Sequence, residues 1–198
     1  NKNIAWVLRG PDGYYLSRNL QNSDSYELGS TNPLLRLPKG DYTLTLDGVG
    51  DTVGDYSFRL VDLAATATGF LPGTAVSSSL SPAYTTRFYK FDATAGERFF
   101  FDRISYGDYY NTTYRLIDPN GNQVWNGYIW PEDQERSTFA WTGTYYLLLE
   151  GRISEGNTVA YSFKVESTNL PNAGGYTSQN FDSDGLPWSP ASFSNAAP

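Results

Sequence analysis

Three residue types are absent from this chain of 198 residues: His, Cys and Met. Without His, the Ser/His/Asp arrangement of serine hydrolases is excluded, and so are zinc sites of the His or Cys type. Without Cys there is no thiol nucleophile and no disulfide, so cysteine pairing says nothing about the redox compartment. Because the chain also has no initiator Met, we expect a processed protein or a part of a longer one.

Charged residues are scarce as well, at 18% of the chain, and 21 acidic residues outnumber 14 basic ones. The net charge of −7 disfavours nucleic acid and acidic membrane surfaces as partners. No apolar run reaches the roughly 18 residues of a membrane-spanning helix. A basic segment followed by an apolar stretch, which would mark a signal peptide, is also missing from the sequence. We therefore expect no membrane span and no nucleic-acid partner.

Aromatic and turn-forming residues are abundant instead, with 16 Tyr, 11 Phe, 5 Trp, 19 Gly and 11 Pro. This composition favours short strands and many turns over helices. Alternation of apolar and polar residues predicts strands at 42–46 and 56–60, the second with Ser57 and Arg59 facing water. We expect an all-β protein with no helix longer than about two turns.

The sequence contains an internal repeat. Residues 8–13 match 116–121, residues 40–48 match 143–151, and residues 56–60 match 161–165, at offsets of 108, 103 and 105. Ordered matches at nearly constant offsets indicate a duplicated unit of roughly a hundred residues. In both copies a Pro-Asp-Gly or Pro-Asn-Gly turn predicts a hairpin, because Asn, Asp and Gly tolerate left-handed backbone angles.

The two copies differ in the number of strands that the sequence predicts. The second copy has strands near 74–80, 85–93 and 97–105, then a hairpin of 112–117 with 123–127, for about eight strands in all. The first copy pairs 3–9 with 13–18, but it has no counterpart of 73–105, so five strands remain. The prediction is two tandem antiparallel jelly-roll-like β-sandwich units, an incomplete one at 1–62 and a complete one at 70–167, followed by an extended tail at 168–198.

Residues 70–166 resemble the bacterial pre-peptidase C-terminal domain. The segments that carry the resemblance are 87–92 (RFYKFD), 95–98 (AGER), 116–121 (LIDPNG), 143–145 (GTY) and 161–163 (YSF). Residues 4–61 look like the C-terminal half of the same domain. The resemblance implies a jelly-roll-like β-sandwich without catalytic activity, in a secreted or cell-surface bacterial protein. Related collagen-binding modules bind calcium and matrix proteins, but the resemblance does not supply a ligand for this chain.

Loop aromatics between 106 and 130 are the candidate ligand-binding residues. Large rigid side chains on loops can stack on sugar rings or anchor a protein partner at low entropic cost. Packing over the end of the sandwich or against the neighbouring unit is the alternative interpretation, and it is favoured in a chain this rich in aromatics. The candidates are Tyr106, Tyr109, Tyr110, Trp125, Tyr128 and Trp130.

Two acidic segments are candidate calcium sites. Asn180, Asp182 and Asp184 precede Gly185 with the spacing of half a calcium-binding loop, but position twelve of that loop is Ala191 rather than Glu. The second segment is a Gly-rich turn of the first unit and contains Asp47, Asp51 and Asp55. Ordinary acidic turns, in which Asp and Gly supply backbone angles, explain both segments as well and are favoured.

Catalysis is not expected. The nucleophile motifs are missing. A carboxylate pair for glycoside hydrolysis is the one catalytic option left open, but acidic residues in hairpin loops are usually just solvated. The candidates for such a pair are Glu132, Asp133, Glu135, Glu150 and Glu155. Two function classes remain: a structural or adhesive extracellular module, or a module that binds polysaccharide or matrix protein through the loop aromatics. For the first class, the tail at 168–198 is a candidate donor strand that completes the first unit, either in its own chain or in a neighbouring copy, which would give a homo-oligomer or a head-to-tail fibre.

Overall fold

The computed structural model describes residues 3–107, 111–128 and 134–168. Within these ranges the regular structure is almost entirely strand, and the one α-helix, α1, has only four residues, Leu63–Thr66. The expectation of an all-β protein without a long helix is confirmed for this part of the chain. In the same part, no helix has the length and hydropathy needed to cross a membrane. Contacts group residues 1–168 into one compact unit.

The first repeat forms a three-stranded antiparallel sheet in the order β2-β1-β3, with β1 at Ile4–Arg9, β2 at Tyr15–Asn19 and β3 at Thr43–Gly48. The predicted hairpin of β1 and β2 is present. Its turn is a short 3-10 element, Pro11–Gly13, in which Asp12 has φ of 53° and Gly13 has φ of 76°. These left-handed angles are why the turn uses Asp and Gly. A second 3-10 turn, Leu20–Asn22, follows β2.

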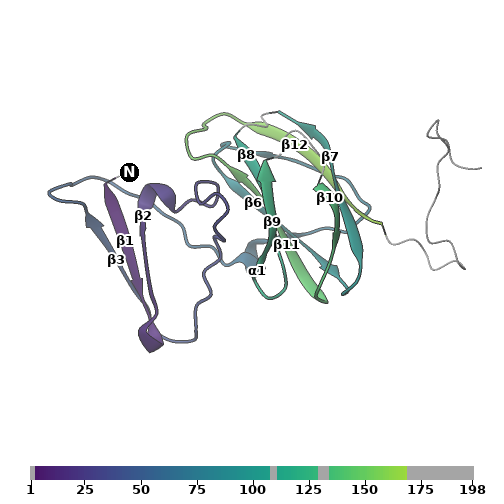
Figure 1. Cartoon of the computed structure of the whole chain (residues 1–198). Coiled ribbons are helices and arrows are strands. Elements are labelled where there is room, and N and C mark those ends of the chain that lie inside the picture. Colours follow the sequence, from purple (N-terminus) through teal and green to yellow (C-terminus); the bar gives the residue numbers. More distant parts are fainter. Residues whose placement is uncertain (1–2, 108–110, 129–133, 169–198) are drawn as a thin grey trace, which may run out of the picture. The chain divides into compact units, whose positions relative to one another are not determined.

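The second repeat forms a β-sandwich of two sheets (Figure 1). One sheet has the order β10-β7-β12-β5 and the other β4-β6-β11-β8-β9; neighbouring strands are antiparallel except β4 and β6. The strands are β4 Thr68–Gly69, β5 Val76–Leu80, β6 Thr86–Ala93, β7 Arg98–Tyr106, β8 Thr112–Ile117, β9 Gln123–Tyr128, β10 Gln134–Thr138, β11 Gly143–Gly151 and β12 Val159–Ser167.

The space between the two sheets is filled mainly by aromatic rings. Phe139 and Tyr145 stack with ring centroids 4.1 Å apart, and Phe91 lies 6.0 Å from each of them. Tyr89 and Tyr161 meet across the core, and their hydroxyls share a hydrogen bond of 2.6 Å. This bond satisfies two polar groups that would otherwise be costly to bury. Nine aromatic residues belong to this core, and Phe70 and Trp125 pack against it.

The strand pairings of the two repeats have the same register. In the first repeat Leu8 is opposite Leu44, and in the second Leu116 is opposite Leu147. These pairs are related by the offsets of 108 and 103 residues that the sequence comparison uses. The hairpins differ at one point, because a β-bulge after Leu116 sets Trp125 opposite it. Such an extra residue changes the face to which the following side chains point.

The predicted strand at 56–60 is wrong. These residues have no strand assignment, and Tyr56, Phe58 and Leu60 are 52%, 53% and 69% exposed. The matching strand of the second repeat, β12, lies between β5 and β7, and it hydrogen-bonds to both. The first repeat contains no counterpart of either neighbour in this chain. Strand patterning without partners does not produce a strand, so the first repeat has three strands rather than the expected five.

Candidate functional site

The outer face of the five-stranded sheet carries a buried ion pair. Along β8, Tyr114 and Leu116 face the core, so the alternation of the strand directs Arg115 to the opposite face. Arg115 and Glu150 are nevertheless only 1% and 0% exposed. The Arg115 Nε donates to Glu150 Oε1 at 2.8 Å, and Nη2 donates to Oε2 at 3.0 Å. This two-pronged geometry is the strongest arrangement that an arginine and a carboxylate can form.

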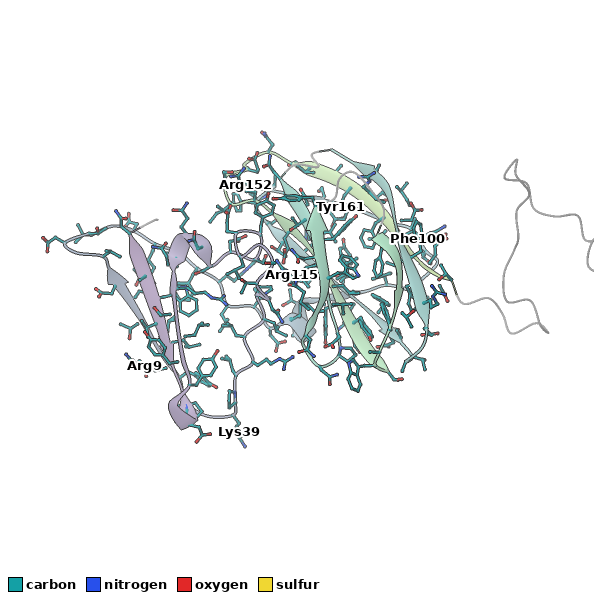
Figure 2. The ribbon with its side chains drawn as sticks, in the orientation of Figure 1. Arg9, Lys39, Phe100, Arg115, Arg152 and Tyr161 are labelled. Atoms are coloured by element: carbon teal, nitrogen blue, oxygen red, sulfur yellow. The ribbon has the colours of Figure 1, made fainter. Side chains whose placement is uncertain are left out.

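Residues 24–36 cover this ion pair; we call them the cover loop. Three backbone carbonyls of the loop accept hydrogen bonds from Arg115: Nη2 donates to Ser25 O at 3.1 Å and Gly29 O at 2.8 Å, and Nη1 donates to Thr31 O at 3.2 Å. Arg115 is labelled in Figure 2. The guanidinium thus joins a segment of the first repeat to two strands of the second. An additional contact of Nη1 is to the side chain of Gln123.

Polar side chains of the β8–β9 hairpin extend the contact along the cover loop. Asn126 donates to Gly29 O at 3.2 Å, and Gln123 donates to Ser30 O at 3.2 Å. At the hairpin turn, Asn32 of the loop donates to the carbonyl of Gly121 at 2.9 Å. Two further bonds hold the ends of the cover loop. The hydroxyls of Ser25 and Thr86 share a hydrogen bond of 3.0 Å, and the Arg36 guanidinium donates to Asn122 Oδ1 at 2.5 Å.

Burial shifts the acid–base properties of the carboxyl groups at this contact. It raises the pKa of Glu150, while the hydrogen bonds and charge of Arg115 lower it. For Asp24, at the start of the cover loop, burial raises the pKa to about 6. A hydrogen bond from the Tyr26 amide opposes this shift, and the negative charges of Glu150 and Glu27 add to it. Ionising Asp24 is therefore unfavourable in the docked loop.

The structure separates two of the predicted ligand-binding aromatics. Trp125 points into the sandwich and its ring lies edge-on to Phe101, with centroids 5.0 Å apart. Tyr128 is on the other face of β9, 59% exposed, and its ring meets Tyr26 of the cover loop at 6.5 Å. Trp125 thus packs as the alternative interpretation has it. Tyr128 is accessible, but its ring contact with Tyr26 is also packing against the first unit, which the same interpretation includes. Tyr109, Tyr110 and Trp130 lie outside the described residues, as does the side chain of Tyr106.

The candidate calcium ligands do not gather in the described part of the chain. There, no three Asp or Glu side chains are close enough to hold a metal ion, and this statement includes Asp47, Asp51 and Asp55. Asn180, Asp182 and Asp184 lie outside the described residues. A calcium site at Asn180, Asp182 and Asp184 therefore stays a prediction. Of the acidic residues considered for catalysis, Glu150 is the buried partner of Arg115.

Sequence reasoning did not single out Arg115 or the cover loop. An arginine at an outward position of a strand normally faces solvent, and nothing local indicates that a distant loop covers it. One signal was available. At the repeat offsets, Arg115 and Glu150 replace Val7 and Asp47 of the first copy, so only the second copy has opposite charges at these two positions.

A second surface of interest is the exposed apolar segment after β3, which we call the open stripe: Tyr56, Phe58 and Leu60. Every second residue is apolar, as in a strand with one buried face. In β12 the matching residues Tyr161, Phe163 and Val165 are 2%, 2% and 0% exposed. The open stripe therefore has the alternating sequence of a core strand, but its apolar side chains are exposed to solvent.

Comparisons with known proteins give a likeness of fold at low identity. No family model matches the chain, and no curated protein matches it. Among solved structures, a periplasmic inhibitor of g-type lysozyme from Aeromonas hydrophila matches with a TM-score of 0.43 and 16% identity, over 52% of this chain and 96% of that one. The pre-peptidase C-terminal domain of a Bacillus anthracis collagenase matches with a TM-score of 0.42 and 18% identity, over 56% and 100%. The g-type lysozyme inhibitor of Salmonella Typhimurium gives 0.37 and 13%, over 51% and 99%. At these values the chain is similar to β-proteins of this kind, and no activity is transferred from them.

Proposed function

We propose that this chain is a non-catalytic structural module of an extracellular or cell-surface bacterial protein, and that its first repeat takes up a β-strand from a second copy. The observation that carries the proposal is the open stripe. The resemblance of residues 70–166 to the pre-peptidase C-terminal domain supports the location and the absence of catalysis. The missing His and Cys residues agree with a role that needs no nucleophile or zinc.

The open stripe has the properties of a strand acceptor. In the second repeat, β12 hydrogen-bonds to β5 along one edge and to β7 along the other. The corresponding backbone groups of 56–60 have no such neighbours in the first repeat. An added strand would pair these groups and bury three large apolar side chains, and both effects favour association. The same addition would shield the rest of the first sheet, where Leu44 is 38% exposed.

The donor in this proposal is the tail at 169–198 of a second copy. It follows directly after β12, and its sequence includes Tyr176, Phe181, Trp188 and Phe193. These 30 residues are long enough for a strand of ordinary length, about five or six residues. A tail that joins the first repeat of the next molecule makes a heterologous contact, and contacts of that kind propagate into fibres unless the geometry closes them.

The experiment compares the intact chain with a chain that ends at Thr168. In sedimentation velocity over a range of concentrations, the intact chain is expected to form dimers and longer species. The shortened chain is expected to stay monomeric and folded. Strand addition in trans is wrong if the intact chain is monomeric at high concentration, or if the shortened chain assembles equally well.

A pair of leucines gives a matched control. Leu60 in the open stripe is 69% exposed, and Leu71 in the second repeat is 76% exposed. Because both are exposed, Leu60→Asp and Leu71→Asp are each expected to change stability by less than about 0.5 kcal/mol. Only Leu60→Asp should reduce assembly, since it places a charge where the donor strand packs. Equal assembly of the two variants would contradict an acceptor at the open stripe.

A second candidate function is binding of polysaccharide or matrix protein. The observation in its favour is the exposed ring of Tyr128, which Tyr26 holds edge-on from the cover loop. A fixed aromatic face is suited to stacking on a sugar. Retention of the intact chain on immobilised glycans and collagen is the measurement. Tyr128→Ala is expected to abolish retention while leaving the fold intact, and unchanged retention would remove Tyr128 from the site.

A further inference from the structure

Arg115 has an arrangement that stability alone does not explain. Its guanidinium is always charged, and burying a charge is costly even when the charge is paired. Replacing a buried ion pair by apolar side chains of similar size is often neutral or stabilising. What an apolar pair cannot do is hydrogen-bond to a partner. The feature that distinguishes Arg115 and Glu150 from such a pair is therefore the cover loop that they recognise.

The recognised group is a cluster of convergent backbone carbonyls. Ser25, Gly29 and Thr31 direct their carbonyl oxygens to one guanidinium because residues 25–30 form successive turns. Backbone bonds from Leu28 N to Asp24 O and from Gly29 N to Tyr26 O, at 3.1 and 3.0 Å, close these turns. Gly29 has φ of 57°, a left-handed angle that glycine adopts readily. A loop of other shape would leave part of the guanidinium buried without partners.

Glu150 holds the guanidinium in the orientation that the loop requires. It uses both carboxylate oxygens on Arg115, and Oε2 also accepts from the hydroxyl of Thr113 at 3.1 Å. With Nε and one edge of Nη2 engaged by Glu150, the other edge of Nη2 faces the carbonyls of the cover loop, and Nη1 donates both to Thr31 O and to the side chain of Gln123. The pair is thus a preformed donor fork rather than a flexible surface charge.

The first repeat lacks this fork. At the matching positions of its sheet, Val7 replaces Arg115 and Asp47 replaces Glu150, in the same strand register. Valine has no donor for a carbonyl. The second repeat can therefore receive the loop of the first, while the matching face of the first repeat cannot receive a loop in the same way. The contact between the repeats is therefore asymmetric, and the residues at these two positions determine which repeat receives the loop.

We propose that the outer face formed by β8, β9 and β11 is a docking surface for the cover loop of the preceding repeat. Arg115 is the specificity-determining residue of this surface. The partner that fits is a loop with three convergent backbone carbonyls, here Ser25, Gly29 and Thr31. Docking sets the position of one repeat against the next, so the two repeats are coupled rather than freely jointed. This proposal does not rest on strand addition, since it concerns contacts within one chain.

The test measures hydrogen exchange of the cover-loop amides in the full chain, at a concentration where it is monomeric. Leu28, Gly29 and Thr31 report on the loop, because their amides bond within it. Arg115→Leu leaves Glu150 buried without its partner, and breaking such a pair is expected to speed exchange at these amides by about a hundredfold or more. Arg152→Leu is the matched control. Arg152 contacts the same loop through Glu27 at 3.7 Å, but it is 48% exposed, so exchange should change little.

A double variant separates recognition from stability. In Arg115→Leu with Glu150→Leu no uncompensated charge remains, so we expect the thermal midpoint to return to, or exceed, that of the unmodified chain. Exchange in the cover loop should nevertheless stay fast, because the carbonyls of Ser25 and Thr31 would lose their Arg115 donor when the loop docks. The carbonyl of Gly29 would keep only the bond from Asn126. If the loop of the double variant is as protected as in the unmodified chain, packing alone holds it and the proposal is overturned. Arg115→Lys is a third variant, in which an ammonium group replaces the guanidinium. If the cover-loop amides of this variant exchange as slowly as in the unmodified chain, the two-pronged guanidinium is not required and the proposal is wrong.

Discussion

Trp125 and Tyr128 sit three residues apart on β9 and should respond very differently to truncation. The ring of Trp125 packs against Phe101 at 5.0 Å, and Tyr128 is 59% exposed. Trp125→Ala removes core packing, and Tyr128→Ala removes little beyond the ring contact with Tyr26. The two variants therefore test directly whether the aromatic residues of β9 serve the core or the surface.

The expected loss of unfolding free energy for Trp125→Ala has three contributions. Truncating a fully buried Trp or Phe to Ala costs about 3–5 kcal/mol. Trp125 is only partly buried, which lowers this figure. Its Nε1 is buried with no hydrogen-bond partner among the described residues, so removing it returns about 1 kcal/mol of desolvation cost. We expect a net loss of about 2–3 kcal/mol for Trp125→Ala, and of less than about 1 kcal/mol for Tyr128→Ala.

Urea and thermal unfolding of the two variants are the assay. For a chain of this size, 1 kcal/mol corresponds to about 2–4 °C in Tm, so Trp125→Ala should lower Tm by about 4–12 °C. Trp125→Phe keeps the ring and removes the unpartnered N–H, and it should stay within about 1 kcal/mol of the unmodified chain. Equal losses for Trp125→Ala and Tyr128→Ala, or no loss for Trp125→Ala, would refute the assignment of Trp125 to the core.

Two further predictions concern the cover loop. Asp24→Asn is expected to stabilise the folded chain above its pKa of about 6 and to have little effect below the ordinary value of 3.8, because folding raises this pKa and stability falls as pH rises between the two values. Urea unfolding at about pH 4 and about pH 7.5 measures this, and a stabilisation confined to acid pH would contradict it. Gly29→Ala is expected to cost about 1 kcal/mol and to speed exchange in the cover loop, since Gly29 has φ of 57°. Gly50→Ala, at φ of 63° and likewise without a neighbour within 4 Å, should cost a similar amount and leave the cover loop protected.

The parts of the fold that depend on local signals were predictable from the sequence. The hairpins around Pro11–Gly13 and Pro119–Gly121 follow from turn chemistry within a few residues, and both are present. The strands predicted near 74–80, 85–93 and 97–105 are also present, as β5, β6 and β7, and each has neighbouring strands to pair with. Residues 56–60 have the same alternation but not the neighbours, and there the prediction fails. Strand formation depends on partners distant in the sequence, and patterning alone does not reveal whether they exist.

The site depends even more on distant residues. Arg115 and Glu150 are 35 residues apart, and the carbonyls they recognise come from a segment more than 80 residues earlier. No spacing rule joins these three segments. Trp125 illustrates a smaller effect, because the β-bulge between Leu116 and Ile117 decides which face of β9 receives its ring. Sequence comparison of the two repeats could have singled out Arg115, but not the loop that covers it.

The central claim, that the open stripe accepts a strand from a second copy, is tested most directly by amide hydrogen exchange at residues 56–60. The measurement is made on the intact chain at low and high concentration, and on the chain that ends at Thr168. We expect these amides to become protected at high concentration in the intact chain alone, because added backbone hydrogen bonds form only in the assembly. Exchange at the rate of an open chain under all three conditions would contradict the claim.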